Sequence, residues 1–81
     1  MLVDMTTSKP PHKASNRAIW LKHQLEIHGT SYAKIAREEG VTRQAARKVV
    51  YSRSSRMEAA IARRLGLMPK QIWPERYPHD A

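Results

Sequence analysis

Long side chains with several hydrogen-bond donors are concentrated in residues 42–51. Projected onto a helix at roughly 100° per residue, this segment divides into two sides. One side carries Ala45, Ala46, Val49 and Val50, and the other carries Arg43, Gln44, Arg47, Lys48 and Tyr51. An arginine fork pairs with guanine O6 and N7, and a glutamine amide pairs with adenine N6 and N7. Because the first turns of a helix in the major groove reach the base edges, contacts with DNA bases are expected here. The predicted base contacts are Thr42, Arg43, Gln44 and Arg47.

Other polar residues near this segment suit contacts with the DNA backbone. Lys48, Arg53 and Arg56 are expected to bind phosphates, which sets the register on the duplex without reading sequence. Ser31, at the predicted start of an earlier helix, is a further candidate because helix N-termini bind phosphate. For Ser31 and the neighbouring Thr30, helix capping is the competing interpretation.

The charge balance of the chain favours an anionic partner. The 81 residues contain 15 Lys and Arg against 7 Asp and Glu, a formal net charge of +8. Two stretches have no acid, one between Asp4 and Glu26 and one between Glu39 and Glu58. Such clustering creates a local positive potential rather than an evenly solvated surface. Nucleic acid is therefore the first expected partner, and a membrane surface is the second.

Several kinds of functional site are excluded by the residues present. Because the chain has no cysteine, it cannot form a disulfide scaffold, a thiolate zinc site or a cysteine nucleophile. His23 and His28 are five residues apart and so lie on different helix faces, which predicts no metal site. There is no acid pair, histidine–nucleophile pair or glycine-rich phosphate loop of the kind that catalysis needs, so we expect no enzyme and no cofactor. No apolar run approaches the roughly 18 residues that a membrane span needs.

Two short helices joined by a glycine-containing turn are typical of a helix-turn-helix. Ala36 is the small residue required where the two helices cross, and Gly40 is the turn residue that accepts a positive φ. The remaining inward positions are apolar, at Ile35, Val41, Ala46 and Val49. Glu39, directly before the turn glycine, occupies a place that is usually apolar in this motif. Either its carboxylate pairs with a nearby arginine, or the turn packs differently from the usual one.

Apolar residues spaced by three and four predict an all-α chain with a compact four- to five-helix fold. The expected helices span residues 16–28, 43–51 and 56–65, with a further helix that begins after Thr30 or Ser31 and runs to Glu39, and a short helical turn at 70–73. Ser15 and Thr42 are the predicted N-caps of the first and third helices. Ser55 and Glu58 fit a capping box at the start of the fourth helix.

One domain with flexible ends is the expected organisation. Residues 1–14 are predicted to be a flexible N-terminal arm, residues 15–78 the DNA-binding domain, and residues 79–81 a tail. Trp73 and Tyr77 are expected to cover the core rather than to stack on a ligand, since so small a domain cannot otherwise close its core. The basic residues near the N-terminus either follow the DNA backbone or minor groove, or are disordered. These residues are Lys9, Lys13 and Arg17.

The chain carries a distinctive string near its end, IWPERY at residues 72–77. With GTS at residues 29–31 and the helix-turn-helix, it makes residues 25–77 resemble the Ner family of small phage and bacterial regulators, whose members end in IWPSRY. The chain departs from the family pattern at Glu39 and at residues 53–55, where members have a Trp-Pro pair. The resemblance implies a λ-repressor-like all-helical fold and regulation of transcription, in transposable phages repression of early or repressor genes.

The sequence thus predicts a sequence-specific DNA-binding regulator, acting as a repressor of phage or mobile-element promoters. Its partner would be double-stranded DNA, bound by paired copies on adjacent half-sites, in the cytoplasm of a bacterial host. The alternative is a basic helical protein that binds a membrane surface or a protein partner. The helix at 43–51 argues against a membrane, because its apolar side is alanine and valine and lacks bulky residues.

Overall fold

The computed structural model describes residues 10–11 and 13–78, and all regular structure in this part of the chain is helical. The elements are α1 (Ala14–Ile27), α2 (Tyr32–Glu39), α3 (Arg43–Arg47), the 3₁₀ turn η1 (Lys48–Val50), α4 (Ser55–Leu65), α5 (Pro69–Ile72) and the 3₁₀ turn η2 (Pro74–Arg76). The predicted all-α class is confirmed. Most of the expected N-terminal arm and the expected tail lie outside the described residues.

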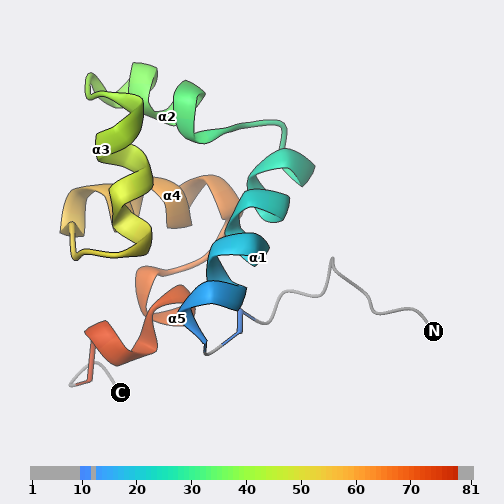
Figure 1. Cartoon of the computed structure of the whole chain (residues 1–81), viewed down its shortest axis with the longest axis vertical. Helices are drawn as coiled ribbons and strands as arrows, with labels where there is room; N and C mark the ends of the chain where they lie inside the picture. The colour runs from blue at the N-terminus through green and yellow to red at the C-terminus, as the bar shows by residue number, and fades with distance from the viewer. Residues whose placement is uncertain (1–9, 12, 79–81) are drawn as a thin grey trace.

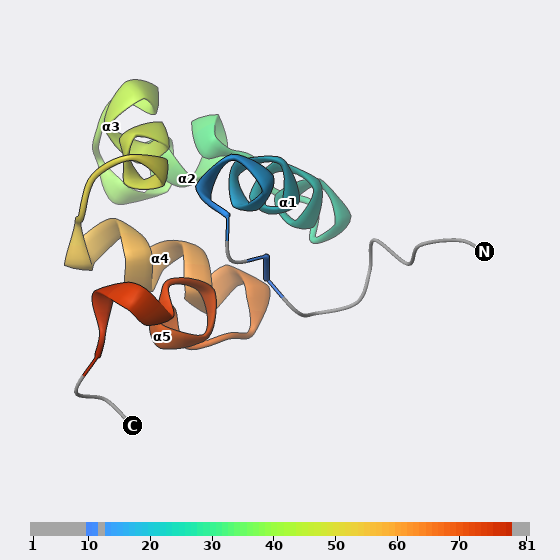
Figure 2. The same cartoon turned by 60° about the horizontal axis from the view of Figure 1, so that its bottom comes forward.

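The five helices surround one core, with α4 at its centre. Helix α4 lies between the α2–α3 pair on one side and α5 on the other, and α1 runs beside them (Figures 1 and 2). Helices α2 and α3 pack directly on each other, and α1, α2 and α5 each contact α4. The outer side of α3 is therefore left uncovered by any other helix of the described chain.

The core is built from apolar residues of every helix. Its buried members are Trp20, Leu21, Leu25, Ile35, Ala36, Ala46, Val49, Met57, Ala60, Ile61, Ala62, Leu65, Ile72 and Trp73. Trp73 is fully buried, which confirms that the C-terminal segment covers the core. A large aromatic at this point removes much apolar surface from water in a domain with few residues to spare.

The turn between α2 and α3 has the expected geometry. Gly40 adopts φ +73° in the left-handed region and ends α2, and the Val41 amide donates to the Ala36 carbonyl at 2.9 Å. The side-chain oxygens of Ser31 and Thr42 accept hydrogen bonds from the amides three residues later, each at 3.1 Å. Both residues are thus N-caps, and α3 begins at the predicted residue.

Helix α1 differs from the expectation at its start. It begins at Ala14 after Lys13, which makes no side-chain capping bond, so Ser15 lies inside the helix and is not the N-cap. Arg17 is almost fully buried in α1. Its guanidinium donates to the Ile72 carbonyl at 3.1 Å and pairs with Glu75 at 2.5 Å. The expectation that Arg17 belongs to a DNA-contacting arm is therefore wrong, because this side chain ties α1 to the C-terminal segment.

The start of α4 and the length of α3 also differ from expectation. The reciprocal cap of α4 is made by Ser54, not Ser55: the Ser54 hydroxyl accepts from the Met57 amide, and Glu58 accepts from the Ser54 amide at 3.0 Å. Glu58 is held from inside the domain, and this fixes which serine it reaches. Helix α3 is α-helical only to Arg47 and continues as the 3₁₀ turn η1. Ala45, expected on the packed side, is exposed.

Candidate nucleic-acid interface

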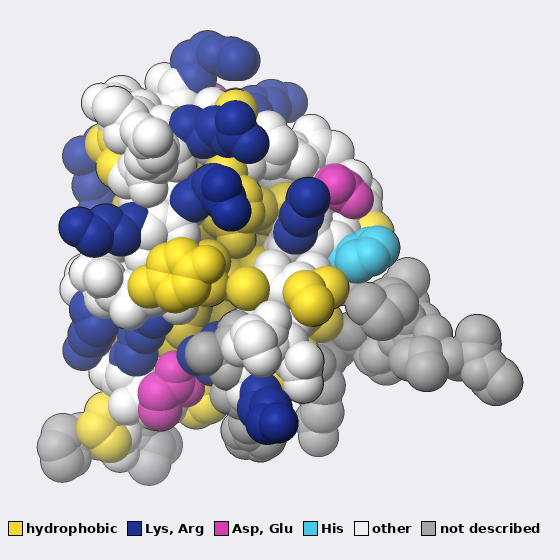
Figure 3. Space-filling model, in the orientation of Figure 1, with side chains coloured by type: hydrophobic (Ala, Val, Ile, Leu, Met, Phe, Trp, Pro, Cys, Tyr) yellow, Lys and Arg dark blue, Asp and Glu magenta, His cyan; other side chains and the backbone are white. Residues whose placement is uncertain are grey.

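The predicted base contacts form one exposed surface on α3. We call Thr42, Arg43, Gln44 and Arg47 the recognition face. All four residues are exposed. The turn at Gly40 ends α2, and Ala46 and Val49 anchor α3 to the core, so the polar side of α3 has to point outward. Lys and Arg side chains gather over α2 and α3 on the face shown in Figure 3.

Within the described chain most arginines have a carboxylate partner, whereas Arg43 and Arg47 of the recognition face and Arg37 of α2 have none. Among the described residues, no carboxylate lies within 4 Å of Arg43, Arg47, Lys48 or of Lys22 on α1. Four glutamates instead pair with arginines of α1, of the loop at residues 51–54, of α4 and of the C-terminal segment. These pairs include Glu38 with Arg64 (2.7 Å), Glu39 with Arg64 (3.3 Å), Glu58 with Arg76 (3.0 Å) and Glu75 with Arg17 (2.5 Å). Positive charge without a carboxylate partner therefore remains around α3 and on α2, where it raises the local concentration of an anionic ligand.

Glu39 resolves the alternative that the sequence left open at the turn. Its carboxylate lies 3.5 Å from Arg56, 3.5 Å from Arg63 and 3.3 Å from Arg64, all on α4. The Arg56 guanidinium also donates to the Glu39 main-chain carbonyl. An acid in this usually apolar place thus joins the helix-turn-helix to α4 through ion pairs. Because Arg56 is 63% exposed, its guanidinium remains accessible from solvent.

A hollow of about 360 Å³ lies between α3 and α4, and it collects the predicted backbone contacts. We call it the α3–α4 hollow. Lys48, Arg53 and Arg56 line it, together with Ser52 and Ser54. Its apolar lining consists of Val41, Ala45, Val49 and Met57. No carboxylate belongs to this lining, although Arg53 lies 3.7 Å from Glu58 and Arg56 lies 3.5 Å from Glu39. Ser31 is not part of this group; as the N-cap of α2 it lines another hollow with Lys22, Glu26 and Arg43.

Residues 51–54, which follow α3 and η1, are held by the C-terminal segment through a buried carboxylate. Glu58 is fully buried and accepts hydrogen bonds from the Ser54 amide (3.0 Å), Arg76 (3.0 Å) and the Tyr77 hydroxyl. Arg76 also donates to the Ser52 carbonyl at 3.4 Å. The Arg53 guanidinium lies 4.9 Å from the centre of the Tyr77 ring. This network fixes the loop that carries Arg53.

The ionisation of Glu58 and Tyr77 follows from this network. Burial raises the pKa of Glu58, but the hydrogen bonds from Tyr77, Ser54 and Arg76 outweigh burial and hold that pKa below its ordinary value. Burial and the hydrogen bond to Glu58 raise the pKa of Tyr77. At neutral pH the pair is therefore a carboxylate and a phenol, the combination in which the phenol can donate.

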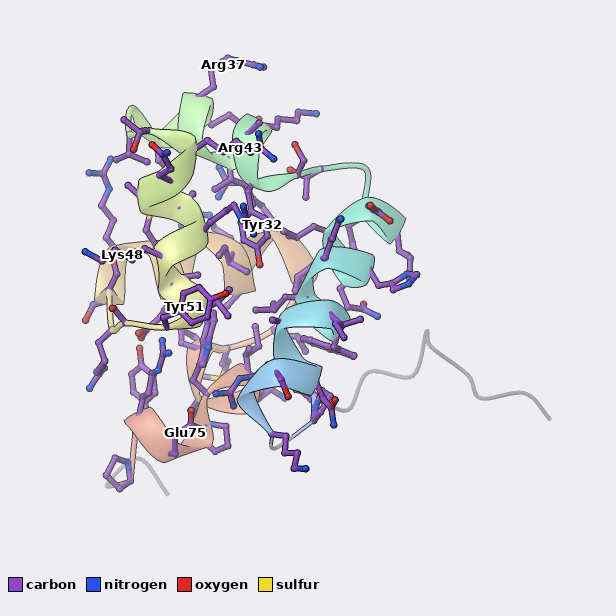
Figure 4. All side chains as sticks on the ribbon, in the orientation of Figure 1. Tyr32, Arg37, Arg43, Lys48, Tyr51 and Glu75 are labelled. Atoms are coloured by element: carbon purple, nitrogen blue, oxygen red, sulfur yellow. The ribbon has the colours of Figure 1, made fainter. Side chains whose placement is uncertain are left out.

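Two features of the candidate site could not be predicted from the sequence. Arg76 and Tyr77 position residues 51–54 through Glu58. The string IWPERY contains both residues, but it does not predict their contacts. Lys22 lies on α1, yet it lines a hollow beside α3 together with Arg43 and Arg47. Its position in an acid-free stretch was the only sequence signal. Figure 4 shows Arg43 on the side of α3 that faces α1 and Lys48 on the opposite side.

No helix of the described residues is long and apolar enough to cross a membrane. Within the same residues, histidines, aspartates and glutamates form no group of three that could hold a metal ion. Residues 10–11 and 13–78 contain no β-strand, so no hairpin wing accompanies the helix-turn-helix in this part of the chain.

Comparison with known families agrees with this geometry. A family model described as winged helix-turn-helix DNA-binding matches residues 19–81, more than three quarters of the chain. Neither the curated proteins nor the solved structures gave a match. The matched range includes α2, the turn at Gly40, α3 and the C-terminal segment. The chain belongs to the winged helix-turn-helix DNA-binding family.

Proposed function

We propose that the protein is a sequence-specific regulator of transcription that inserts α3 and η1 into the major groove of double-stranded DNA. The observation that carries this proposal is the recognition face, whose arginines are exposed and have no carboxylate partner among the described residues. Arg43 and Arg47 can each offer a fork to guanine, and Gln44 can pair with adenine. Thr42, at the N-cap, contacts a base edge at the start of the helix.

Contacts with phosphates complete the proposed interface. Lys48, Arg53 and Arg56 of the α3–α4 hollow bind the backbone beside the inserted helix and set its register. Ser31 binds a phosphate at the start of α2, because its hydroxyl accepts from the Lys34 amide and still has a hydrogen to donate. We assign the DNA-binding domain to residues 15–78, with residues 1–14 as an arm and residues 79–81 as a tail.

The regulatory direction of the protein is proposed from its resemblance to the Ner family. The string IWPERY at residues 72–77 supports a repressor that occludes a phage or mobile-element promoter at the bacterial nucleoid. A single helix-turn-helix buries a modest interface, so two copies on neighbouring half-sites are expected to bind together. The half-site centres would then be about one helical turn, or a multiple of it, apart.

Selection from a pool of random duplexes, followed by titration of the enriched duplex at several salt concentrations, tests the proposal. The full chain is expected to enrich one motif, arranged as two half-sites, and to bind it about 10³-fold or more tightly than random DNA. If about six phosphates are engaged, log K falls with log salt concentration with a slope of about −5.

The outcomes of this experiment separate the parts of the proposal. Failure to enrich any motif, or a slope near zero, contradicts sequence-specific DNA binding. Enrichment of a single half-site bound by one copy contradicts the paired arrangement alone. A reporter whose promoter overlaps the enriched site is expected to fall in expression when the protein is present, and unchanged or raised expression contradicts the repressor assignment.

A further inference from the structure

A second hollow lies on the opposite side of α3, against α1. We call it the α1–α3 hollow; its volume is about 180 Å³. Lys22 lines it from α1, Arg43 and Arg47 line it from α3, and Tyr32, Val50 and Tyr51 supply its aromatic and apolar walls. In Figure 3, apolar surface is visible between dark blue side chains at the junction of α3 and α1.

The charges around this hollow call for an anion. Its lining includes three cations and no carboxylate, and the described chain places no acid within ion-pairing distance of any of the three. Tyr32 contributes no negative charge, since a phenol is neutral at physiological pH and burial raises the pKa of Tyr32 further, to about 12. Three like charges around a partly apolar space repel one another unless a ligand of opposite charge enters.

The place of the hollow relative to α3 indicates which anion enters it. An α-helix with its side chains is about 10–12 Å across, and the major groove is about 12 Å wide. A helix that fills the groove therefore has the phosphates of one strand on one flank and those of the other strand on the opposite flank. The α3–α4 hollow and the α1–α3 hollow lie on these two flanks, as the opposite directions of Lys48 and Arg43 in Figure 4 illustrate.

We infer that the α1–α3 hollow binds a DNA phosphodiester of the strand opposite to the one bound by Lys48 and Arg53, with Lys22 as the principal phosphate contact. The inference rests on the proposed insertion of α3 in the major groove. Arg43 and Arg47 belong to the recognition face and extend toward bases, whereas Lys22 belongs to α1, outside the groove. A lysine ammonium is a compact point charge that binds phosphate without the planar geometry of an arginine fork.

The test is a salt titration of the enriched duplex with the unsubstituted chain, with Lys22→Gln and with two control variants. Lys22→Gln is expected to lower the magnitude of the salt slope by about one and the affinity by about eightfold at 0.1 M salt, with the base preference unchanged. Lys22→Arg retains the charge and is expected to keep the slope. Lys70→Gln, on α5 at the far side of α4 from α3, removes the same charge and is expected to change neither quantity. Circular dichroism checks that each variant is folded.

Ethylation interference on the same duplex shows which strand carries each contacted phosphate. Relative to the full chain, Lys22→Gln is expected to lose a phosphate contact on one strand, and Arg53→Gln one on the other strand. If Lys22→Gln binds with the affinity and slope of the full chain, or if both variants lose contacts on the same strand, the inference is overturned while DNA binding stands. If the full chain itself binds no duplex, the proposed function and this inference both fall.

Discussion

At the scale of single residues, the arginines of this chain differ in burial and in whether a glutamate pairs with them. Arg17 and Arg76 are nearly buried and bonded to glutamates, and they hold the fold together. Arg43 and Arg47 are exposed and have no carboxylate partner within the described residues. An arginine that is already paired must break that pair to bind DNA, so the unpaired ones are the contacts expected to add most to affinity.

Arg47→Ala and Lys48→Gln are expected to weaken DNA binding in distinguishable ways. Loss of a guanine contact by Arg47→Ala costs about 1–3 kcal/mol on the enriched duplex and relaxes preference at one base pair. Loss of a phosphate contact by Lys48→Gln weakens binding to all sequences alike and lowers the salt slope by about one. Competition titrations with single-base variants of the duplex measure both effects. Equal weakening of enriched and random DNA by Arg47→Ala would show that Arg47 reads no base.

Gly40→Ala is expected to destabilise the domain through its backbone alone. A Cβ at this position meets no atom within 4 Å, so no clash contributes. The φ of +73° is disfavoured for a residue with a Cβ, at a cost of about 1–2 kcal/mol. Urea unfolding measures the change, and Gly40→Asn is the matched control, since asparagine tolerates this conformation better. An alanine variant as stable as the original chain would contradict this reason for the glycine.

At the scale of elements, local signals in the sequence predicted the helix-turn-helix. They did not predict the long-range contacts that join it to the rest of the domain. Ser31, Gly40 and Thr42 act on amides or dihedrals within a few residues of themselves, so their roles in ending and starting helices could be predicted from sequence. The partners of Arg17 and Glu58 lie 58 and 18 residues away, and no periodicity encodes such distances. Ser15 and Ser55 were wrong as caps, since α1 begins after Lys13 without a side-chain cap and Ser54 caps α4.

The arrangement of the candidate site could be predicted from the sequence only in part. The recognition face follows from the helical projection of one short segment, so its four exposed residues could be selected together. Lys22 could not be joined to that segment from sequence, because only the packing of α1 beside η1 brings it to the hollow. The sequence predicted Arg56 as a phosphate contact. It could not predict the pairing of Arg56 with Glu39, because that pairing depends on how α2 packs against α4.

The C-terminal segment is expected to stabilise residues 51–54 through the Tyr77 hydroxyl. Tyr77→Phe keeps the ring beside Arg53 and removes one hydrogen bond to the buried Glu58 carboxylate, which should cost about 1.5–3 kcal/mol of unfolding free energy. DNA affinity should fall several-fold as well, because Arg53 belongs to the same loop. Tyr51→Phe is the control for stability, since Tyr51 is 81% exposed. If Tyr77→Phe unfolds at the same urea concentration as the original chain, the hydroxyl does not contribute.

At the scale of the whole molecule, carboxylates join the helices through ion pairs, and the side around α3 stays positive. The Arg64 hydrogen bond lowers the pKa of Glu38. Burial raises the pKa of Glu58 and of Glu75, but hydrogen bonds and nearby arginines lower it by more than burial raises it. The pKa of each carboxyl therefore lies below the ordinary 4.5. A carboxyl whose pKa is lower in the folded chain contributes stability above its unfolded pKa and loses that stability as pH falls through the folded value.

Thermal stability is therefore expected to be nearly constant from pH 7 to pH 5 and to fall as the pH drops below about 4.5. Glu38→Gln removes one of the contributing carboxyls from an exposed position and should make the acid loss shallower. Glu26→Gln, which removes an exposed glutamate of α1 that has no ion pair among the described residues, should keep the original profile. Melting temperatures at closely spaced pH values provide the comparison. A profile of Glu38→Gln that parallels the original at every pH would contradict the role given to its pairing with Arg64.

The most direct test of the central claim, that α3 enters DNA while the rest of the domain supports it, is an amide chemical-shift titration of the ¹⁵N-labelled full chain with the enriched duplex. The largest changes are expected in residues 42–54, with a further group around Lys22 on α1, and small changes are expected in α5. Largest changes in α5 or on the exposed side of α1 at Ile19 and Ile27, with residues 43–48 unaffected, would contradict the claim.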